Sequence, residues 1–197
     1  MLDTLSVVNE MLGTLGEAPI NDIDAFHPMV PRCVATLNTM NITVQADKWW
    51  FNTEYLTLTP QVGTGEILLP TDCLSADACR ASPRVTMRDG KLYNLDDATY
   101  IFTANVAVEI KRLVPFDQTP FTARVYIGCR AVQKFQSTID GDQAKMRDLG
   151  TETKNAYIVF NAEHIRNAQV NFLARPSTAA VLNNMRGSRV ANTRRWG

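Results

Sequence analysis

The chain has 197 residues, which is room for one domain, or one domain with a small insertion, and disfavours a multi-domain enzyme. Hydrophobic residues make up 45% and charged residues 20%, so the bulk of the chain is expected to fold, and disorder along its whole length is excluded. The 20 basic and 20 acidic residues give a formal net charge of zero. A monomer without net charge has little to keep it apart from its neighbours, so we expect self-association.

The charges are unevenly distributed along the chain. The last acidic residue is Glu163, and every charged residue after it is an arginine: Arg166, Arg175, Arg186, Arg189, Arg194 and Arg195. A block of one sign seldom folds on itself and usually contacts a surface of opposite sign. We therefore predict that residues 175–197 form a basic C-terminal arm for nucleic acid or an acidic protein surface. A disordered solubilising tail is the alternative.

The cysteines and the N-terminus indicate the compartment. The four cysteines have no Cys-x-x-Cys pair and no histidine at ligand spacing, so we expect reduced core thiols and no metal site: Cys33, Cys73, Cys79 and Cys129. The N-terminus lacks the pattern of a secretory signal, and no window approaches the roughly 18 apolar residues that span a bilayer. We expect no membrane partner and assembly in a cytoplasm.

Two helices are predicted before residue 52. The first has an apolar stripe of Leu5, Val8, Leu12 and Leu15, with Asp3 or Thr4 able to cap its start and Gly16 to end it. The second is predicted from about residue 31 to residue 47, with this stripe: Val30, Val34, Leu37, Met40 and Val44. The aromatic run at residues 49–51 is interpreted as core at a domain junction rather than as a stacking platform for nucleic acid.

An antiparallel sheet is predicted for residues 53–115. The strand candidates alternate or are rich in β-forming residues: 54–59, 66–69, 84–88, 91–95, 99–103 and 106–114. Asp89 and Gly90 join two of them, and a two-residue Asp-Gly linker indicates a hairpin because both positions of a type I′ turn need positive φ.

Helical periodicity returns after Thr119 and Pro120. One helix is predicted with Phe121, Val125, Gly128, Val132 and Phe135 on one face, and a long one from about residue 142 to residue 173. The sequence thus predicts an α+β fold, in which a helical bundle (1–52 and 116–174) carries an inserted antiparallel β domain (53–115) and a basic arm (175–197).

No catalytic motif is assembled in the sequence. The two histidines, His27 and His164, have no partner serine in a Gly-x-Ser-x-Gly elbow, and residues 63–65 form a Gly-x-Gly without a following Lys-Ser or Lys-Thr. Two acidic pairs occur in polar turns and do not match a calcium-binding loop: Asp72 with Asp77, and Asp140 with Asp142. We predict a protein that is no enzyme and has no cofactor or metal.

The N-terminal third carries a family resemblance. Residues 5–20 read LSVVNEMLGTLGEAPI, followed by KWWFN at 48–52, LTLTP at 56–60 and VEIKRLV at 108–114. This pattern resembles the tail tubular protein A family, the head-to-tail adaptors of short-tailed podovirus bacteriophages. The resemblance implies a structural virion protein that forms a ring, expected to be dodecameric, in the tail. It also implies a portal protein and a tail nozzle as partners, tail fibres as a further candidate, and genomic DNA passing through the lumen without sequence-specific binding.

We expect the basic arm to dock on the portal or on a neighbouring subunit through Arg175, Arg186, Arg189, Arg194, Arg195 and Trp196. One alternative is a virion-associated hydrolase of glycans or peptidoglycan that uses paired carboxylates such as Asp96, Asp97 or Glu109. Another is a nucleic-acid-binding module whose affinity falls steeply with salt.

Overall fold

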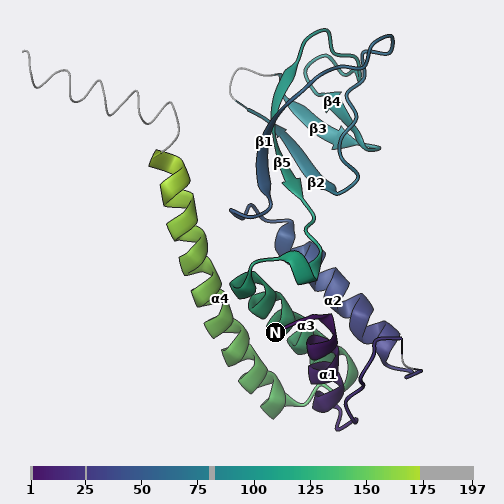
Figure 1. Ribbon diagram of the computed structural model, residues 1–197, viewed down its shortest axis with the longest axis vertical. Helices are drawn as coiled ribbons and strands as arrows, with labels where there is room; N and C mark the ends of the chain where they lie inside the picture. Colours follow the sequence, from purple (N-terminus) through teal and green to yellow (C-terminus); the bar gives the residue numbers. More distant parts are fainter. Residues whose placement is uncertain (1, 25, 80–82, 174–197) are drawn as a thin grey trace, which may run out of the picture.

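The computed structural model describes residues 2–24, 26–79 and 83–173, and within them the predicted α+β fold class is confirmed. The helices are α1 (Thr4–Thr14), α2 (Val30–Gln45), α3 (Phe121–Ile139) and α4 (Gln143–Leu173), with a short 3₁₀ helix at Phe116–Gln118. The strands are β1 (Thr53–Leu58), β2 (Cys73–Ala78), β3 (Val85–Arg88), β4 (Lys91–Asn94) and β5 (Val106–Arg112). Figure 1 shows the helices at one end of the molecule and the strands at the other.

The helices and the strands enclose separate cores. Buried side chains of α1, α2, α3 and α4 form one cluster, and those of the strands and their loops form another. The strands lie between α2 and α3 in the chain, as an insertion requires. The division at residues 52/53 and 115/116 stays a prediction, and the two cores are consistent with it.

Helix α1 begins where the sequence predicts it. The Asp3 carboxylate accepts a hydrogen bond from the Ser6 N–H at 2.8 Å, which satisfies one of the unpaired donors of the first turn. The buried residues are Val7, Val8, Met11 and Leu12. The predicted stripe is therefore rotated, because Val7 and Met11 face α2 and α3 while Leu5 and Leu15 are half-buried.

The sheet has two parts. Strands β1, β5 and β2 form an antiparallel sheet in the order β1-β5-β2, and β3 and β4 form a separate hairpin. The predicted turn at Asp89 and Gly90 is confirmed, with φ values of 49° and 70°. In register, Leu56 lies opposite Val108, and Ala76 lies opposite Ile110.

Two strand predictions are wrong, and one strand was missed. Residues 66–69 and 99–103 form no strand, only isolated bridges such as Glu66 with Ile101, because turns with positive φ at Gly65 and Ala98 redirect the chain. Strand β2 was not predicted, since its sequence CLSADA has few β-branched or aromatic residues. Pairing with β5, a tertiary contact, places it in the sheet.

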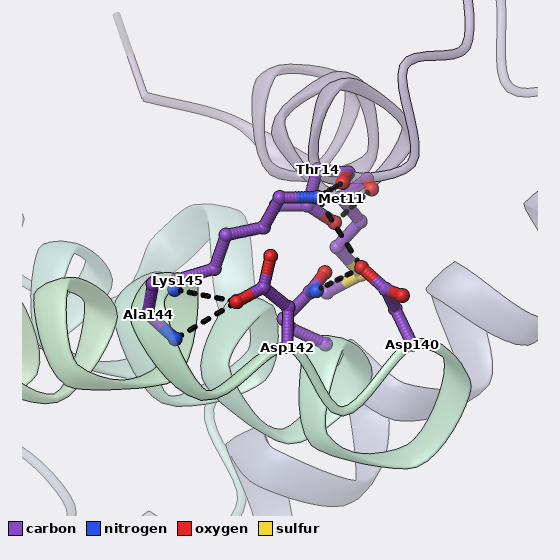
Figure 2. A network of polar contacts seen from close by, with 7 residues as sticks. Met11, Thr14, Asp140, Asp142, Ala144 and Lys145 are labelled. Carbon is purple, nitrogen blue, oxygen red and sulfur yellow. Dashed lines mark hydrogen bonds and ion pairs between the residues drawn. The ribbon is translucent and has the colours of Figure 1, made fainter.

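The corner between α3 and α4 holds α1 in place (Figure 2). Gly141 has a φ of 68°, and the Asp142 carboxylate accepts a hydrogen bond from the Ala144 N–H at 2.8 Å to begin α4. The Lys145 ammonium then donates to the Thr14 carbonyl at 3.0 Å and to Asp140 at 3.2 Å. A cation at the carbonyl end of α1 also complements the helix dipole.

Helix α4 is the longest element, with 31 residues. It packs antiparallel along α3 and continues past it in the direction of the sheet (Figure 1). Thr153 and Phe160 are its buried residues up to residue 168, with Met146, Leu149 and Ala156 half-buried beside them. Among the described residues, no helix combines the length and apolar character needed to cross a membrane.

Candidate assembly surface

The predicted docking residues of the basic arm lie outside the described residues. These are Arg175, Arg186, Arg189, Arg194, Arg195 and Trp196. Their docking role stays a prediction. Of the arginines after Glu163, Arg166 alone is described, and it is exposed on α4.

The aromatic run at residues 49–51 is core, as predicted, and is not a stacking platform. Trp49 is 7% exposed, and its ring centroid lies 4.3 Å from that of Phe160 on α4. Its indole N–H donates to the Val44 carbonyl at 2.6 Å. His164 meets Trp49 edge-on at 5.1 Å, and burial lowers the pKa of this imidazole. The contacts of Trp49 with Phe160, His164 and Val44 hold α4 against the end of α2.

The carboxylates nominated for hydrolysis are engaged in structural contacts. Asp96 accepts hydrogen bonds from the backbone N–H and the guanidinium of Arg84, which lower the pKa of Asp96. Asp97 accepts from the Asn94 side chain, and Glu109 on β5 forms an ion pair with Lys48. A general acid needs a raised pKa, so the environment of Asp96 is opposite to that requirement.

The other polar candidates also have structural contacts. Asp72 pairs with Arg112 at 2.7 Å, Asp140 pairs with Lys145, and Asp142 caps α4. The imidazole Nδ1 of His27 accepts from the Met29 N–H at 3.2 Å. Within residues 2–24, 26–79 and 83–173, no group of three or more His, Cys, Asp or Glu side chains could hold a metal ion.

One recess of the helical part is a groove formed by α1, α3 and α4. It consists of two adjoining hollows of about 280 Å³ and about 470 Å³. Both are lined by Phe121, Val125, Cys129 and Glu152. Val159 borders the first hollow, and Leu2 and Glu10 border the second. We call this recess the α1–α3–α4 groove.

The rim of the groove is apolar. Phe121 is 63% exposed and Val159 is 57% exposed. The sequence placed Phe121 on the inward face of its helix, which is wrong. Phe121 is the first residue of α3, where no preceding turn of the helix covers the side chain, and α4 lies beside Thr122 instead. The groove itself was not predicted, because its residues come from three separate helices.

Two exposed glutamates also border the groove. Burial, together with the charge of Glu152, raises the pKa of Glu10. Burial and the charges of Glu152 and Glu10 raise the pKa of the Cys129 thiol to about 11. In the part of the chain that the structure describes, no lysine or arginine forms an ion pair with Glu10 or Glu152.

A second uncovered surface lies on the outer side of α4. Ile158 is 56% exposed and Ile165 is 46% exposed. With the exposed Ala162 they follow the i, i+4, i+7 spacing of one helix face. We call these three residues the α4 outer stripe. Together with Phe121 and Val159, the stripe leaves several large apolar side chains of the helical part exposed, as an interaction site would.

The chain is similar to known proteins over most of its length. A family model described as "Tail tubular protein" matches residues 5–180. The chain is also similar to "Tail tubular protein A" of Klebsiella phage KP34, with 24% identity over 164 residues. That alignment covers 83% of this chain and 87% of the relative.

Proposed function

The chain belongs to the tail tubular protein family, and from that premise we propose that it forms a ring that connects the portal to the tail nozzle. Members of this family are structural proteins, and this chain is a virion component of the phage tail. In the proposed ring, subunits associate through their helical parts, and the genome passes through the centre during ejection. The ring is expected to be dodecameric.

The observation that carries the proposal is the apolar surface of the helical part. The α4 outer stripe and the rim residues Phe121 and Val159 leave large side chains in water. Burying this surface against another subunit would stabilise the assembly by about 25 cal/mol for each Å² of apolar area removed from water. A formal net charge of zero removes the general repulsion that would oppose close packing of many copies.

The polar residues favour a structural role. Within the described part of the chain, six of the nominated acidic residues form ion pairs, turn contacts or helix caps: Asp72, Asp96, Asp97, Glu109, Asp140 and Asp142. Asp77 is exposed on β2. The six engaged residues stabilise a scaffold and have little freedom for proton transfer. We therefore propose that the protein is no enzyme and that it needs no cofactor.

The basic arm and the net-acidic remainder of the chain suit different roles: the arm suits docking, and the remainder suits the wall of a DNA channel. We propose that Arg175, Arg186, Arg189, Arg194, Arg195 and Trp196 dock on the portal or on a neighbouring subunit after assembly. A net-acidic channel wall would not hold the genome tightly, because tight binding requires many phosphates to be neutralised by lysine and arginine.

Native mass spectrometry of the full chain, alone and mixed with the portal protein of the same phage, tests the proposal. We expect a ring either alone or on addition of portal, and a shift to a portal–ring complex in the mixture. A monomer whose mass does not change with portal would contradict the adaptor role. Deleting the residues after Arg175 should then weaken portal binding, and unchanged binding would contradict the role of the arm.

A further inference from the structure

The α1–α3–α4 groove has a chemical character that the C-terminal segment of the chain matches. We propose that, in the isolated subunit, residues 174–197 bind in the groove of their own molecule, with arginines facing Glu10 and Glu152. This inference concerns the free subunit and does not depend on the ring. Assembly would exchange the intramolecular contact for contacts with the portal or a neighbour.

The groove requires an occupant that is both apolar and cationic. Phe121, Val125 and Val159 offer an apolar surface that water covers poorly. Glu10 and Glu152 border the same recess, and burial together with their charges raises the pKa of the Cys129 thiol. No lysine or arginine among the described residues forms an ion pair with either glutamate. Glu10 and Glu152 are exposed at the border of the groove, where partial burial and the charge of Glu152 raise the pKa of Glu10. A guanidinium placed between the two would offset the repulsion between their charges.

The C-terminal segment has this composition. Residues 174–197 contain five arginines and no acidic residue. Apolar side chains stand next to the arginines: Val181, Leu182 and Met185 precede Arg186, and Val190 follows Arg189. Apolar side chains next to arginines fit a groove that is lined by both apolar side chains and carboxylates.

The segment is long enough to reach the groove. Glu152 lies 21 residues before the end of α4 at Leu173, which is about 32 Å at 1.5 Å per helical residue. Residues 174–186, extended at about 3.3 Å each, span roughly 43 Å. Arg175 is too close to α4 to return that far, so Arg186 and Arg189 are the first arginines able to meet Glu152 and Glu10.

Binding within one molecule is favoured over binding between molecules. A tethered segment of this length has an effective concentration in the millimolar range. The free concentration of a second copy in a dilute solution is far lower. A neighbouring subunit would compete only after assembly brings its own segment or groove to a similar local concentration.

The native Cys129 thiol provides the test, because it lines both hollows of the groove. The full-length protein is treated with methyl methanethiosulfonate, and the labelled peptides are measured by mass spectrometry. We expect Cys129 to react roughly tenfold faster in the Arg186→Glu/Arg189→Glu variant than in the wild type. This is the protection that an effective concentration of about 1 mM gives to a contact with a dissociation constant of about 0.1 mM. Cys79, in the sheet part, should react equally in both.

The charge effect of the substitution cannot produce this result. Removing cations from the groove would raise the pKa of Cys129 further and slow its reaction. The matched control is Lys134→Glu/Arg147→Glu, which makes the same change in net charge at exposed positions of α3 and α4 outside the groove lining. The control should react like the wild type. Equal rates in the wild type and the Arg186→Glu/Arg189→Glu variant would overturn the proposal.

Cross-linking identifies which molecule supplies the segment. The full-length Arg189→Lys variant keeps the charge and adds an amine that a carbodiimide couples directly to a nearby carboxylate. An equal mixture of isotope-labelled and unlabelled protein should give links from residue 189 to Glu10 or Glu152 within one isotope only. Mixed-isotope links alone, or no link to either glutamate, would overturn binding within the same molecule.

Discussion

The side-chain amide of Gln45 hydrogen-bonds to both the N–H and the carbonyl of Val114. The Nε2 group of Gln45 donates to the Val114 carbonyl at 2.8 Å, and the Val114 N–H donates to Oε1 of Gln45 at 2.8 Å. The Val114 carbonyl also accepts a hydrogen bond from the Asn41 amide at 3.3 Å. Gln45 is fully buried at the end of α2, and Val114 is where the chain leaves β5. One buried amide therefore connects the end of the helical part to the exit of the sheet.

Replacing Gln45 with alanine should destabilise the protein strongly. The Gln45→Ala variant leaves the N–H of Val114 without a partner and its carbonyl with only the longer hydrogen bond from the Asn41 amide at 3.3 Å. An unsatisfied buried group costs about 1–3 kcal/mol. We expect the free energy of unfolding to fall by about 3 kcal/mol in urea titrations. The exposed Gln143 is the control, and Gln143→Ala should change stability by less than about 0.5 kcal/mol. Equal losses in the two variants would contradict the role of Gln45.

Two glycine-to-alanine substitutions should change the free energy of unfolding in opposite directions. Gly90 has a φ of 70° in the β3–β4 turn, so the Gly90→Ala variant should lose about 1 kcal/mol of unfolding free energy. Gly13 lies in α1, has no positive φ, and would place a new Cβ in open space. The Gly13→Ala variant should gain about 0.5–1 kcal/mol. Urea titrations of both variants test the pair, and a loss in Gly13→Ala would contradict the helical environment assigned to that residue.

Local patterns predicted most of the elements. Asp3 and the Asp89-Gly90 pair each carry their structural signal within a few residues, so the start of α1 and the hairpin are found from sequence. Strand β2 depends on its partner β5, which lies about 30 residues away, and its own residues carry no such signal. The exposed face of Phe121 was missed for the same reason, since the position of α4 decides it.

The candidate surface was less predictable than the fold. Glu10, Cys129 and Glu152 stand on three helices, and nothing in their spacing along the chain indicates that they share a groove. The α4 outer stripe does repeat at helical spacing, but the inward residues around Phe160 repeat at the same spacing on the other side. Periodicity alone cannot say which of two apolar faces is covered.

His164 should make stability depend on pH. Its pKa is lowered by burial against Trp49, so the folded protein resists protonation that the unfolded chain accepts at the ordinary value of 6.5. The stabilisation is present above pH 6.5 and is lost as the pH falls through the lowered folded-state pKa. We expect the Tm to fall between pH 7.5 and pH 5.

Variants at the two histidines isolate this effect. The His164→Asn variant should show a smaller change in Tm over this pH range, measured by circular dichroism. The His27→Asn variant leaves His164 in place and should keep the wild-type dependence. The same slope in the wild type and the His164→Asn variant would show that other groups cause the loss at low pH.

The α4 outer stripe should be needed for assembly of the subunits but not for folding of the subunit. Ile158 and Ile165 are about half exposed, so a change to lysine removes little buried surface from the subunit. The Ile158→Lys/Ile165→Lys variant should unfold within about 1 kcal/mol of the wild type. Any interface that buries the stripe would have to desolvate two ammonium groups, which is strongly unfavourable without partners. Native mass spectrometry should therefore show loss of the ring, or of the portal complex.

The matched control changes an exposed apolar residue of the sheet part to lysine. Leu95 is 41% exposed, and the Leu95→Lys variant adds a lysine far along the chain from α4. It should assemble like the wild type if subunits associate through their helical parts. Normal assembly of the stripe variant would rule out the stripe as an interface, and loss of assembly in the Leu95→Lys variant would instead place a contact on the sheet. The two variants together locate the surface through which the subunits meet.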